Sequence, residues 1–359
     1  MTIMDILDEK KQKNVTIDAQ DVKAYLDKYI MGQEDAKIAA SMCLLNNSLG
    51  VKDNVLFIGA SGSGKTEIFR RLQEYYQNKF GTDTEKANKV FIFDSSHITE
   101  SGIVGENFNS VFMQMRASGF SKDEIEHAII VFDEFDKTVA PRIVSGGTNI
   151  STIIQGELLT MIENGNIAVG KEGKEGYKIY NTSKMNFAFC GAFTELRDKK
   201  TKKSRQMTIG FTETDNRSDK IEIDFDDLIE YGMINEVAGR ISTVVTLNTL
   251  TKDQIERLIS DENMGVVANL KRKYSMFDLD ISITKEFEDE LVASALDNKR
   301  GLRYINGRAQ AVFNRELFSK GSTGLIIINR MERIVQQEEI EVSDDEFDED
   351  DEFDWGFKN

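Results

Sequence analysis

One glycine-rich segment has the residue types and the spacing of a phosphate-binding loop. Its residues are Gly59, Ala60, Ser61, Gly62, Ser63, Gly64, Lys65 and Thr66. Glycines let the main chain turn tightly enough for several N–H groups to point toward one anion, and a following helix adds its positive N-terminal end. In such a loop the lysine contacts the β- and γ-phosphates of a nucleotide, and the Thr66 hydroxyl binds Mg²⁺. The segment therefore predicts a site for ATP and Mg²⁺.

A second apolar segment ends in two carboxylates, Asp133 and Glu134, which supply the other half of a nucleotide site. We expect Asp133 to hold Mg²⁺ through its water shell. Glu134 would orient and activate the water that attacks the γ-phosphate. The pair alone is weak evidence, because apolar strands often end in acidic residues. Together with the glycine-rich loop, it favours hydrolysis of the nucleotide over binding alone.

Apolar segments typical of buried strands recur along the first two thirds of the chain. They cover residues 54–58, 90–93, 128–132, 185–189 and 242–246, and helical patterns separate them. This alternation predicts an α/β fold, a parallel sheet with helices on both faces. Ligands of such sheets bind at the carboxyl ends of the strands, where the glycine-rich loop and the two carboxylates are expected.

The pattern changes after Leu247. A helix is predicted from Thr251 towards Tyr274, followed by a short strand, two more helices and a last apolar run at residues 324–329. These features predict a smaller, mainly helical domain. The expected organisation is an irregular segment at 1–18, a large ATPase domain at 19–247, a small domain at 248–330 and an acidic, disordered tail at 331–359.

The composition excludes several classes of protein. The chain has 359 residues, of which 40% are hydrophobic and 30% charged, so it can bury a substantial core. No apolar run approaches the roughly 18 residues that span a bilayer, and the first residues lack the layout of a signal peptide. We therefore expect a cytoplasmic protein with no membrane partner. Only Cys43 and Cys190 are cysteines and only two histidines occur, so neither a disulfide framework nor a zinc site is predicted.

The net charge of −17 is unevenly distributed. Residues 338–359 contain twelve carboxylates and one lysine, and so contribute −11 of that charge. Such a segment repels itself too strongly to fold alone, although its interleaved aromatic residues could anchor a partner. The rest of the chain is mildly acidic and has no long basic stripe, which argues against a nucleic-acid partner.

Motifs over about residues 20–320 resemble those of the ClpX-type unfoldases, a group of AAA+ ATPases. Residues 26–37 match the family's opening motif, in which Ile30 and Met31 would cover the adenine. Residues 226–240 match the segment that ends in the arginine finger, which would be Arg240. Residues 299–303 match the sensor-2 motif and would place Arg303 on the phosphates from the small domain. A zinc-binding domain that typically precedes these motifs has no counterpart in the sequence.

The resemblance implies a ring. Arg240 would project from one subunit into the nucleotide site of the next and neutralise charge on the γ-phosphate, and six copies would form a homo-hexamer. Arg303 would couple ATP binding to movement of the small domain. No sensor-1 residue is assigned, because the strand at residues 185–189 and the following Cys190 and Gly191 lack the usual polar side chain.

Two further motifs bear on partners. The residues at the place of the family's axial pore loop are Gly102, Ile103, Val104 and Gly105. Ile103 replaces the usual aromatic residue there, so we expect a weaker grip on the protein substrate. The tripeptide Ile209, Gly210 and Phe211 lies in a polar stretch between Asp198 and Lys220, which predicts a long flexible loop. In ClpX-like unfoldases this tripeptide docks into a ClpP-type peptidase.

The sequence thus predicts an ATPase that unfolds protein substrates and threads them into a ClpP-type peptidase. Two alternatives stay open. One is a remodelling chaperone that works without a peptidase and makes no use of the docking tripeptide. The other is a regulatory subunit that enters ClpX-type rings, for which Ile103 and a weakly charged second pore loop at residues 170–176 would be the signs. The intact pair of Glu134 and Arg240 argues against the regulator.

Overall fold

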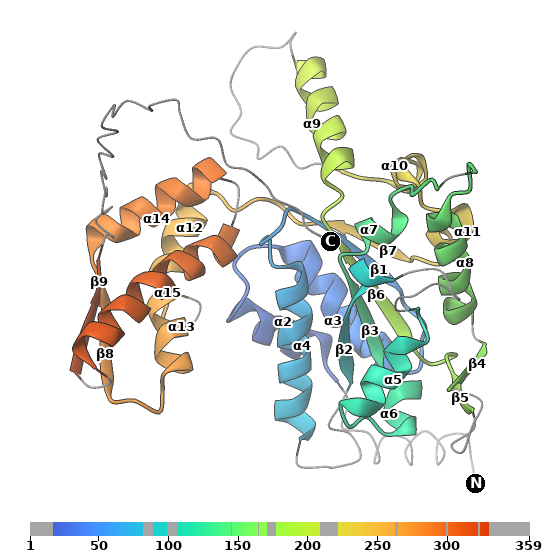
Figure 1. Ribbon diagram of the computed structural model, residues 1–359, viewed down its shortest axis with the longest axis horizontal. Coiled ribbons are helices and arrows are strands. Elements are labelled where there is room, and N and C mark those ends of the chain that lie inside the picture. The colour runs from blue at the N-terminus through green and yellow to red at the C-terminus, as the bar shows by residue number, and fades with distance from the viewer. Residues whose placement is uncertain are drawn as a thin grey trace, which may run out of the picture.

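The computed structural model divides into a sheet-containing part and a C-terminal part (Figure 1). At three places in its helices, residues 203–208, 297–298 and 301–303, only the main chain is described. The described residues are 17–81, 89–98, 107–144, 146–163, 165–170, 177–208, 222–262, 265–298, 301–321 and 324–329.

The central element is a parallel sheet in the order β2-β3-β6-β1-β7. Each strand lies within two residues of a run that the sequence predicts, so the parallel α/β sheet is confirmed. The non-sequential order requires crossover connections, which the intervening helices provide. The strands are β1 (Val55–Ile58), β2 (Val90–Asp94), β3 (Ile129–Asp133), β6 (Asn186–Gly191) and β7 (Thr243–Thr246).

Helices cover both faces of this sheet. Successive side chains of a strand point to opposite faces, so apolar strands such as these need cover on both. In β1, Val55 and Phe57 join one hydrophobic cluster, and Leu56 and Ile58 join another. The first cluster packs under α2 (Ala19–Asp27), α3 (Glu34–Ser48) and α4 (Lys65–Phe80). The second packs under α5 (Ser110–Ala117), α6 (Lys122–Glu126), α7 (Asp136–Val139), α8 (Ile150–Ile162), α10 (Phe225–Tyr231) and α11 (Asn235–Ala238).

Two small elements beside the sheet were not predicted. An antiparallel hairpin of β4 (Asn166–Val169) and β5 (Lys178–Asn181) follows α8, and a short 3-10 turn, η1 (Ser95–His97), follows β2. Each hairpin strand buries one large side chain, Val169 or Tyr180. Strands this short carry too few alternating residues to be recognised in a sequence.

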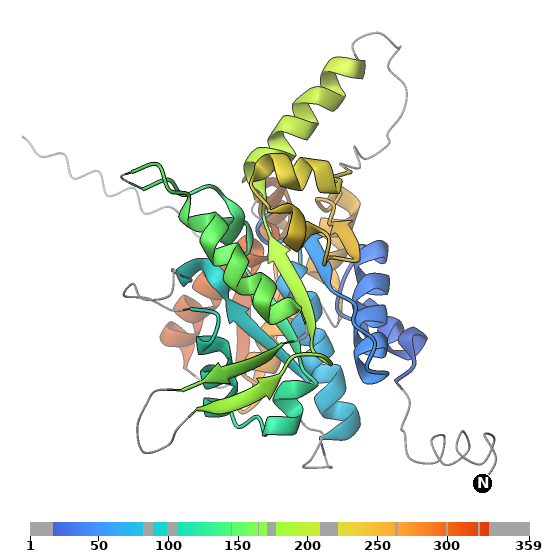
Figure 2. The same cartoon turned by 90° about the vertical axis from the view of Figure 1, so that its right-hand side faces the viewer.

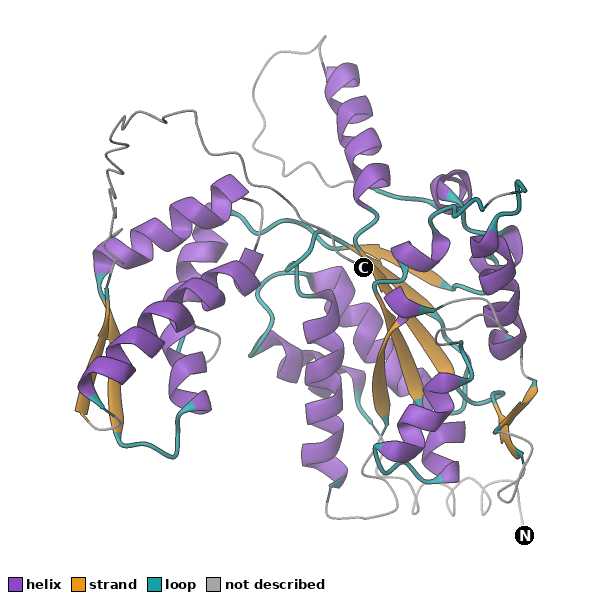
Figure 3. Cartoon of the chain, viewed as in Figure 1, coloured by secondary structure: helices purple, strands orange, loops and turns teal. Residues whose placement is uncertain are grey.

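The C-terminal part is mainly helical, as predicted (Figure 3). Its own hydrophobic cluster is centred on Phe287, Leu291, Ile305 and Phe313, and two parallel strands pack against it. The elements are α12 (Lys252–Ser260), α13 (Val266–Lys273), β8 (Leu279–Ile283), α14 (Lys285–Asn298), α15 (Gly301–Lys320) and β9 (Gly324–Ile328).

The prediction of one helix from Thr251 towards Tyr274 is wrong. The helix is interrupted between α12 and α13, and α13 begins directly after Gly265. A Cβ atom on Gly265 would lie 2.2 Å from the carbonyl oxygen of Asp261, so only glycine allows this tight turn. The apolar spacing continues across the break and hides it from a periodicity argument.

The prediction of a loop between Asp198 and Lys220 is also wrong in its first half. Helix α9 (Thr194–Thr208) extends through this stretch and projects away from the sheet (Figure 2). Lysine, arginine and glutamine make the stretch look like a loop by polarity, yet these residues have high helix propensity. The buried side chain of Leu196 and an ion pair between Lys200 and Asp227 of α10 fix its base.

Candidate nucleotide-binding site

The glycine-rich loop lies between β1 and α4, at the edge where the parallel strands end. Gly62 and Gly64 have φ values of 80° and 102°, a left-handed conformation that favours glycine. A Cβ atom on Gly59 would lie 2.7 Å from Ser63 Oγ and 2.9 Å from Leu247 Cβ. The sequence therefore needs these glycines to form a tight main-chain cradle at the start of α4.

Lys65 lies inside this cradle. Its Nζ atom donates hydrogen bonds to the carbonyl oxygens of Gly59 at 2.7 Å and Ala60 at 3.1 Å. Burial lowers the pKa of the ammonium group, although the carboxylate of Asp133 partly opposes that shift. Ser63 Oγ is buried without a hydrogen-bond partner among the described residues. A buried cation and an unsatisfied hydroxyl in a main-chain cradle fit the oxygens of a phosphate.

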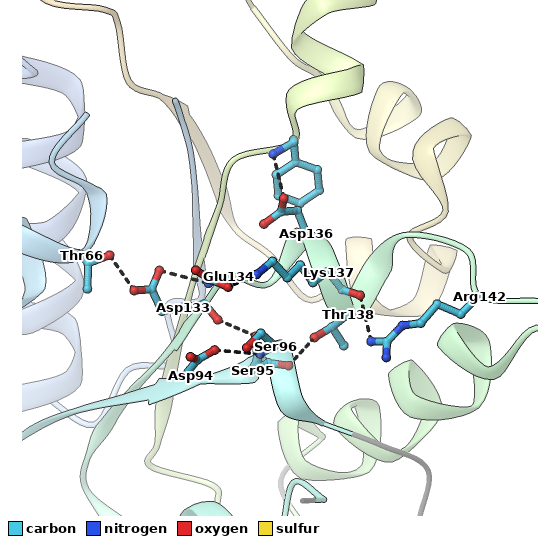
Figure 4. A network of polar contacts seen from close by, with 11 residues as sticks. Thr66, Asp94, Ser95, Ser96, Asp133, Glu134, Asp136, Lys137, Thr138 and Arg142 are labelled. Carbon is cyan, nitrogen blue, oxygen red and sulfur yellow. Dashed lines mark hydrogen bonds and ion pairs between the residues drawn. The ribbon is translucent and has the colours of Figure 1, made fainter. Parts of the chain in front are cut away.

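Thr66 and Asp133 come together as their predicted metal-binding role requires. Thr66 Oγ1 donates to Asp133 Oδ2 at 2.8 Å, and Asp133 Oδ1 accepts from the Glu134 N–H at 3.0 Å (Figure 4). A hydroxyl beside a carboxylate is an oxygen donor set that suits Mg²⁺ when phosphates complete its coordination. The chemistry of these residues therefore fits the metal that the sequence predicts.

Glu134 has a strained main chain. Its φ of 57° is in the left-handed region, which residues other than glycine enter rarely and mostly at functional sites. The carboxylate forms an ion pair with Lys137 and raises the pKa of that ammonium group (Figure 4). The strand end is also tied to η1, the turn after β2, since Ser95 Oγ donates to the Asp133 carbonyl at 2.6 Å. The general base predicted from the sequence is thus held in a defined network.

A cavity of about 1080 Å³ extends from this loop to the C-terminal part. Ile30 and Met31, which the sequence assigns to the adenine, line it. Apolar side chains from the C-terminal part also line it: Leu250, Leu258, Val266 and Leu270. The cavity therefore offers a phosphate-binding end and an apolar end, the two requirements of a nucleotide.

Arg303 falls on the face of α15 that borders this cavity. Asn306, Gly307 and Gln310 line the cavity and follow Arg303 by three, four and seven residues, which is the spacing of one helix face. The main chain at Arg303 is helical, and its side chain lies outside what the structure describes. Its contact with phosphates stays a prediction.

Sequence reasoning missed several residues of the cavity. Tyr29 lines it, and the Arg71 guanidinium lies 4.6 Å from the centre of the Tyr29 ring. Arg272 of α13 lies 5.9 Å from the centre of the same ring and so links the C-terminal part to the segment between α2 and α3. Thr194, the first polar side chain after β6, also lines the cavity. The position of Thr194 directly after a strand end was the signal that could have identified it.

Arg240 is at the opposite edge of the sheet. It precedes β7, whose Thr243 pairs with Val55 at the start of β1, whereas the glycine-rich loop follows the other end of β1. Arg240 Nη2 lies 2.5 Å from Glu163 Oε1. We call this side, where the strands begin, the amino edge, and the side with the loop the carboxyl edge. Within one chain the structure does not bring Arg240 to Lys65.

Other predicted residues cannot be placed. Gly102, Ile103, Val104 and Gly105 lie outside the described residues, as do Ile209, Gly210 and Phe211. Within the described parts of the chain, no group of three or more His, Cys, Asp or Glu side chains is arranged to hold a metal ion. Of the helices that the structure describes, none is long and apolar enough to cross a membrane.

Comparison with known proteins agrees with this geometry. A family model for the AAA domain (Cdc48 subfamily) matches residues 51–244. Three similar proteins are each named the ATP-binding subunit ClpX of an ATP-dependent Clp protease. That of Treponema denticola is 28% identical over 87% of this chain and 80% of its own length. That of Borrelia duttonii is 29% identical, over 79% and 71% of the two chains. That of Porphyromonas gingivalis is 24% identical, over 84% and 77%.

The family match covers more than half of the chain, including β1, the glycine-rich loop and both carboxylates at the end of β3. The similarity to the ClpX proteins extends beyond it into the C-terminal part. The chain therefore belongs to the AAA domain (Cdc48 subfamily) family and is a ClpX-like AAA+ protein.

Proposed function

We propose that this protein is an ATP-driven unfoldase that works as a ring of six and delivers protein substrates to a ClpP-type peptidase. The observation that carries the ATPase part is the contact between Thr66 and Asp133 at 2.8 Å. It joins the glycine-rich loop to the strand end that bears Glu134, so the metal-binding groups and the general base share one site. The names of the similar proteins support the unfoldase and peptidase parts.

In this proposal the described residues divide the work of hydrolysis. Lys65 exchanges its carbonyl partners for the β- and γ-phosphates, which its ammonium group neutralises better. Thr66 and Asp133 would hold Mg²⁺, which would neutralise charge on the same phosphates. Glu134 accepts the proton of the attacking water. Arg240 of the neighbouring subunit contacts the γ-phosphate.

We place the boundary between a large domain (19–247) and a small domain (248–330) after Leu247. Leu247 is buried in a cluster of the sheet, whereas Leu250 packs against the separate cluster of the C-terminal part. The Gln33 side chain bonds both main-chain groups of Asn248, at 2.8 and 3.0 Å. These bonds link the segment of Ile30 and Met31, which we assign to the adenine, to the connection between the two domains. In this proposal, ATP that binds in the cavity between the two domains moves one domain against the other, and Arg303 contributes from α15.

The proposed docking to a peptidase rests on sequence and on the position of α9. This helix projects from the sheet (Figure 2), and the tripeptide Ile209 to Phe211 follows it directly. An apolar tripeptide carried on such a support suits insertion into an apolar cleft of a partner. Six copies on one ring would act together and bind far more strongly than one.

The proposed function is tested by ATPase, unfolding and binding assays on the purified full chain. We expect ATP-dependent unfolding of a stable fluorescent reporter that carries an unstructured tail, and ATP-dependent binding to a ClpP-type peptidase from the same cell. Phe211→Ala should abolish peptidase binding and leave ATP hydrolysis intact. Thr214→Ala, a change of similar kind in the same segment, is the matched control and should bind normally.

Three results would change the proposal. Unfolding without any peptidase binding would indicate a remodelling chaperone that works alone. Absence of ATP hydrolysis by the intact chain, under conditions in which it assembles, would refute the ATPase itself. Binding that survives Phe211→Ala would move the docking surface elsewhere on the ring.

A further inference from the structure

The amino edge of the sheet carries a cluster of charged groups around Arg240. Arg240 Nη2 and Glu163 Oε1 are 2.5 Å apart, and the two residues are 77 positions apart in the chain. Glu163 ends α8, and its N–H donates to the Leu159 carbonyl at 2.9 Å, so the carboxylate stands on a fixed main chain. No other ion pair of Arg240 is present among the described residues.

The main chain of Arg240 is also fixed. Asn54 Nδ2 donates to its carbonyl oxygen at 2.8 Å, and the Arg240 N–H donates to the Val237 carbonyl at 3.0 Å. The side chain is half exposed. An arginine side chain has many rotamers, and a fixed main chain alone does not choose among them. The contact with Glu163 is the interaction that selects one orientation.

A second cation, Lys52, favours other orientations of the Arg240 side chain by repulsion. Lys52 Nζ donates to the carbonyl oxygens of Ile162 at 2.6 Å and Thr182 at 3.1 Å. Burial, with a smaller contribution from the charge of Arg240, lowers the pKa of Lys52 to about 8. The two positive charges therefore repel each other. Without the Glu163 carboxylate, the guanidinium would turn away from Lys52 toward solvent.

The contact uses one nitrogen of the guanidinium. An arginine has five N–H donors in a rigid fork, so the remaining donors can contact a phosphate while Nη2 stays on Glu163. An ion pair of this kind orients the group and leaves most of its N–H donors available.

We propose that Glu163 is a positioning residue that holds the Arg240 guanidinium ready for the nucleotide of the neighbouring subunit. This inference rests on the proposed role of Arg240 in trans. Glu163 itself touches neither substrate nor metal. Its effect on hydrolysis arises because a group already oriented loses less freedom when the transition state forms.

The test compares ATPase kinetics of Glu163→Ala, Glu163→Gln and the native chain. We expect Glu163→Ala to lower kcat about tenfold and to change KM for ATP less than twofold, because the interaction acts in the transition state. Glu163→Gln keeps the reach and a carbonyl oxygen that accepts from the guanidinium, so it should stay within about threefold of the native kcat. Glu256→Ala, which removes the exposed pair with Lys252 in α12, is the matched control and should hydrolyse ATP normally.

A double-mutant cycle with Arg240→Ala separates positioning from a structural role. In the Arg240→Ala chain, Glu163→Ala should cause no further loss. A further tenfold loss there would overturn the inference, and so would a rise in kcat/KM of the single variant, which would make Glu163 a competitor of the phosphate. If Glu163→Ala does not fold, Glu163→Asp withdraws the carboxylate by one methylene and should lower kcat in the same way.

The two proposals fail differently. Should Arg240→Ala hydrolyse ATP as fast as the native chain, the role of Arg240 in trans is refuted, and the positioning role with it. Should Arg240→Ala lose activity while Glu163→Ala keeps it, the positioning role alone is refuted.

Discussion

The two edges of the central sheet differ in how many of the proposed ATPase residues each brings together within one chain. At the carboxyl edge, hydrogen bonds join Thr66, Asp133 and Glu134 of one chain, and Lys65 lies in the cradle at the start of the same helix as Thr66. At the amino edge, Arg240 is held by Glu163 on the other side of the sheet from any phosphate-binding group. A parallel sheet separates these edges by the length of its strands. A reaction that needs both edges therefore needs two chains.

The exposure of Lys65 at the carboxyl edge also differs from that of Arg240 at the amino edge. Lys65 is 8% exposed, whereas the Arg240 side chain is 50% exposed. A buried cation can only serve a ligand that enters its own chain, and an exposed one can meet a partner. An isolated surface ion pair such as Arg240 with Glu163 adds little stability, so its value lies in orientation.

The largest expected effect tests whether the two edges work in different chains. Arg240→Ala should lower kcat by about a thousandfold. Glu134→Gln should bind ATP and lose at least about a hundredfold in turnover. When the two variants are mixed equally and reassembled, one adjacent pair in about four joins an intact Glu134 to an intact Arg240. ATPase assays should then recover about a quarter of the native activity, since the defects lie on opposite sides of the same interface.

The mixing experiment has a direct control. Two Arg240→Ala preparations that are mixed in the same way should stay inactive. If mixed assemblies form, as native mass spectrometry can show, and activity still does not return, both edges act within one chain and the comparison is wrong.

A smaller effect is expected when the metal-binding contact at the carboxyl edge is removed. Thr66→Val keeps the shape of the side chain and deletes the hydroxyl that bonds Asp133. The Mg²⁺ concentration for half-maximal ATPase activity should rise about tenfold, as a metal site loses one oxygen partner. Thr66→Ser retains the hydroxyl and should need the native Mg²⁺ concentration. An unchanged Mg²⁺ requirement in Thr66→Val would remove the metal-binding role of this contact.

At the carboxyl edge, the contact between Thr66 and Asp133 could be predicted from the sequence, whereas Tyr29 and Arg272 of the same cavity were missed. Every parallel strand that ends in a buried apolar run delivers its next residues to the same edge, so Thr66 and Asp133 were expected to share a metal. Local patterns sufficed because Asp133 ends a strand and Thr66 lies in the first turn of a helix. Thr194 was missed although the same rule applies to it.

The amino edge could not be predicted in the same way. Arg240 was found by resemblance, and its partner Glu163 lies at the end of a helix with no pattern to connect them. The helix α9 and the turn at Gly265 were mispredicted because polarity and apolar spacing do not report helix propensity or a close contact of Cβ. Contacts between distant segments, and local steric limits, become visible only in the three-dimensional structure.

The smallest expected effect concerns the pH dependence of stability that arises from buried lysines such as Lys65 and Lys52. Burial lowers the pKa of Lys65 and brings that of Lys52 to about 8. Lysine has its usual pKa near 10.5 when unfolded, so the unfolded chain binds more protons at Lys52 between about pH 8 and 10.5. Stability from this group must therefore rise with pH in that window and be lowest below pH 8.

Lys52→Met should remove this contribution. We expect the urea midpoint of the native chain, followed by circular dichroism, to rise relative to that of Lys52→Met as the pH increases from 7.5 to about 10. The change should amount to at most about 1 kcal/mol, because Lys52 is only partly buried and solvent screens its charge. Lys89 precedes β2 at the same edge, and burial also brings its pKa to about 8, so Lys89→Met should show a pH-dependent difference of the same sign. A difference between the native chain and Lys52→Met that does not vary with pH would show that folding does not lower the pKa of Lys52.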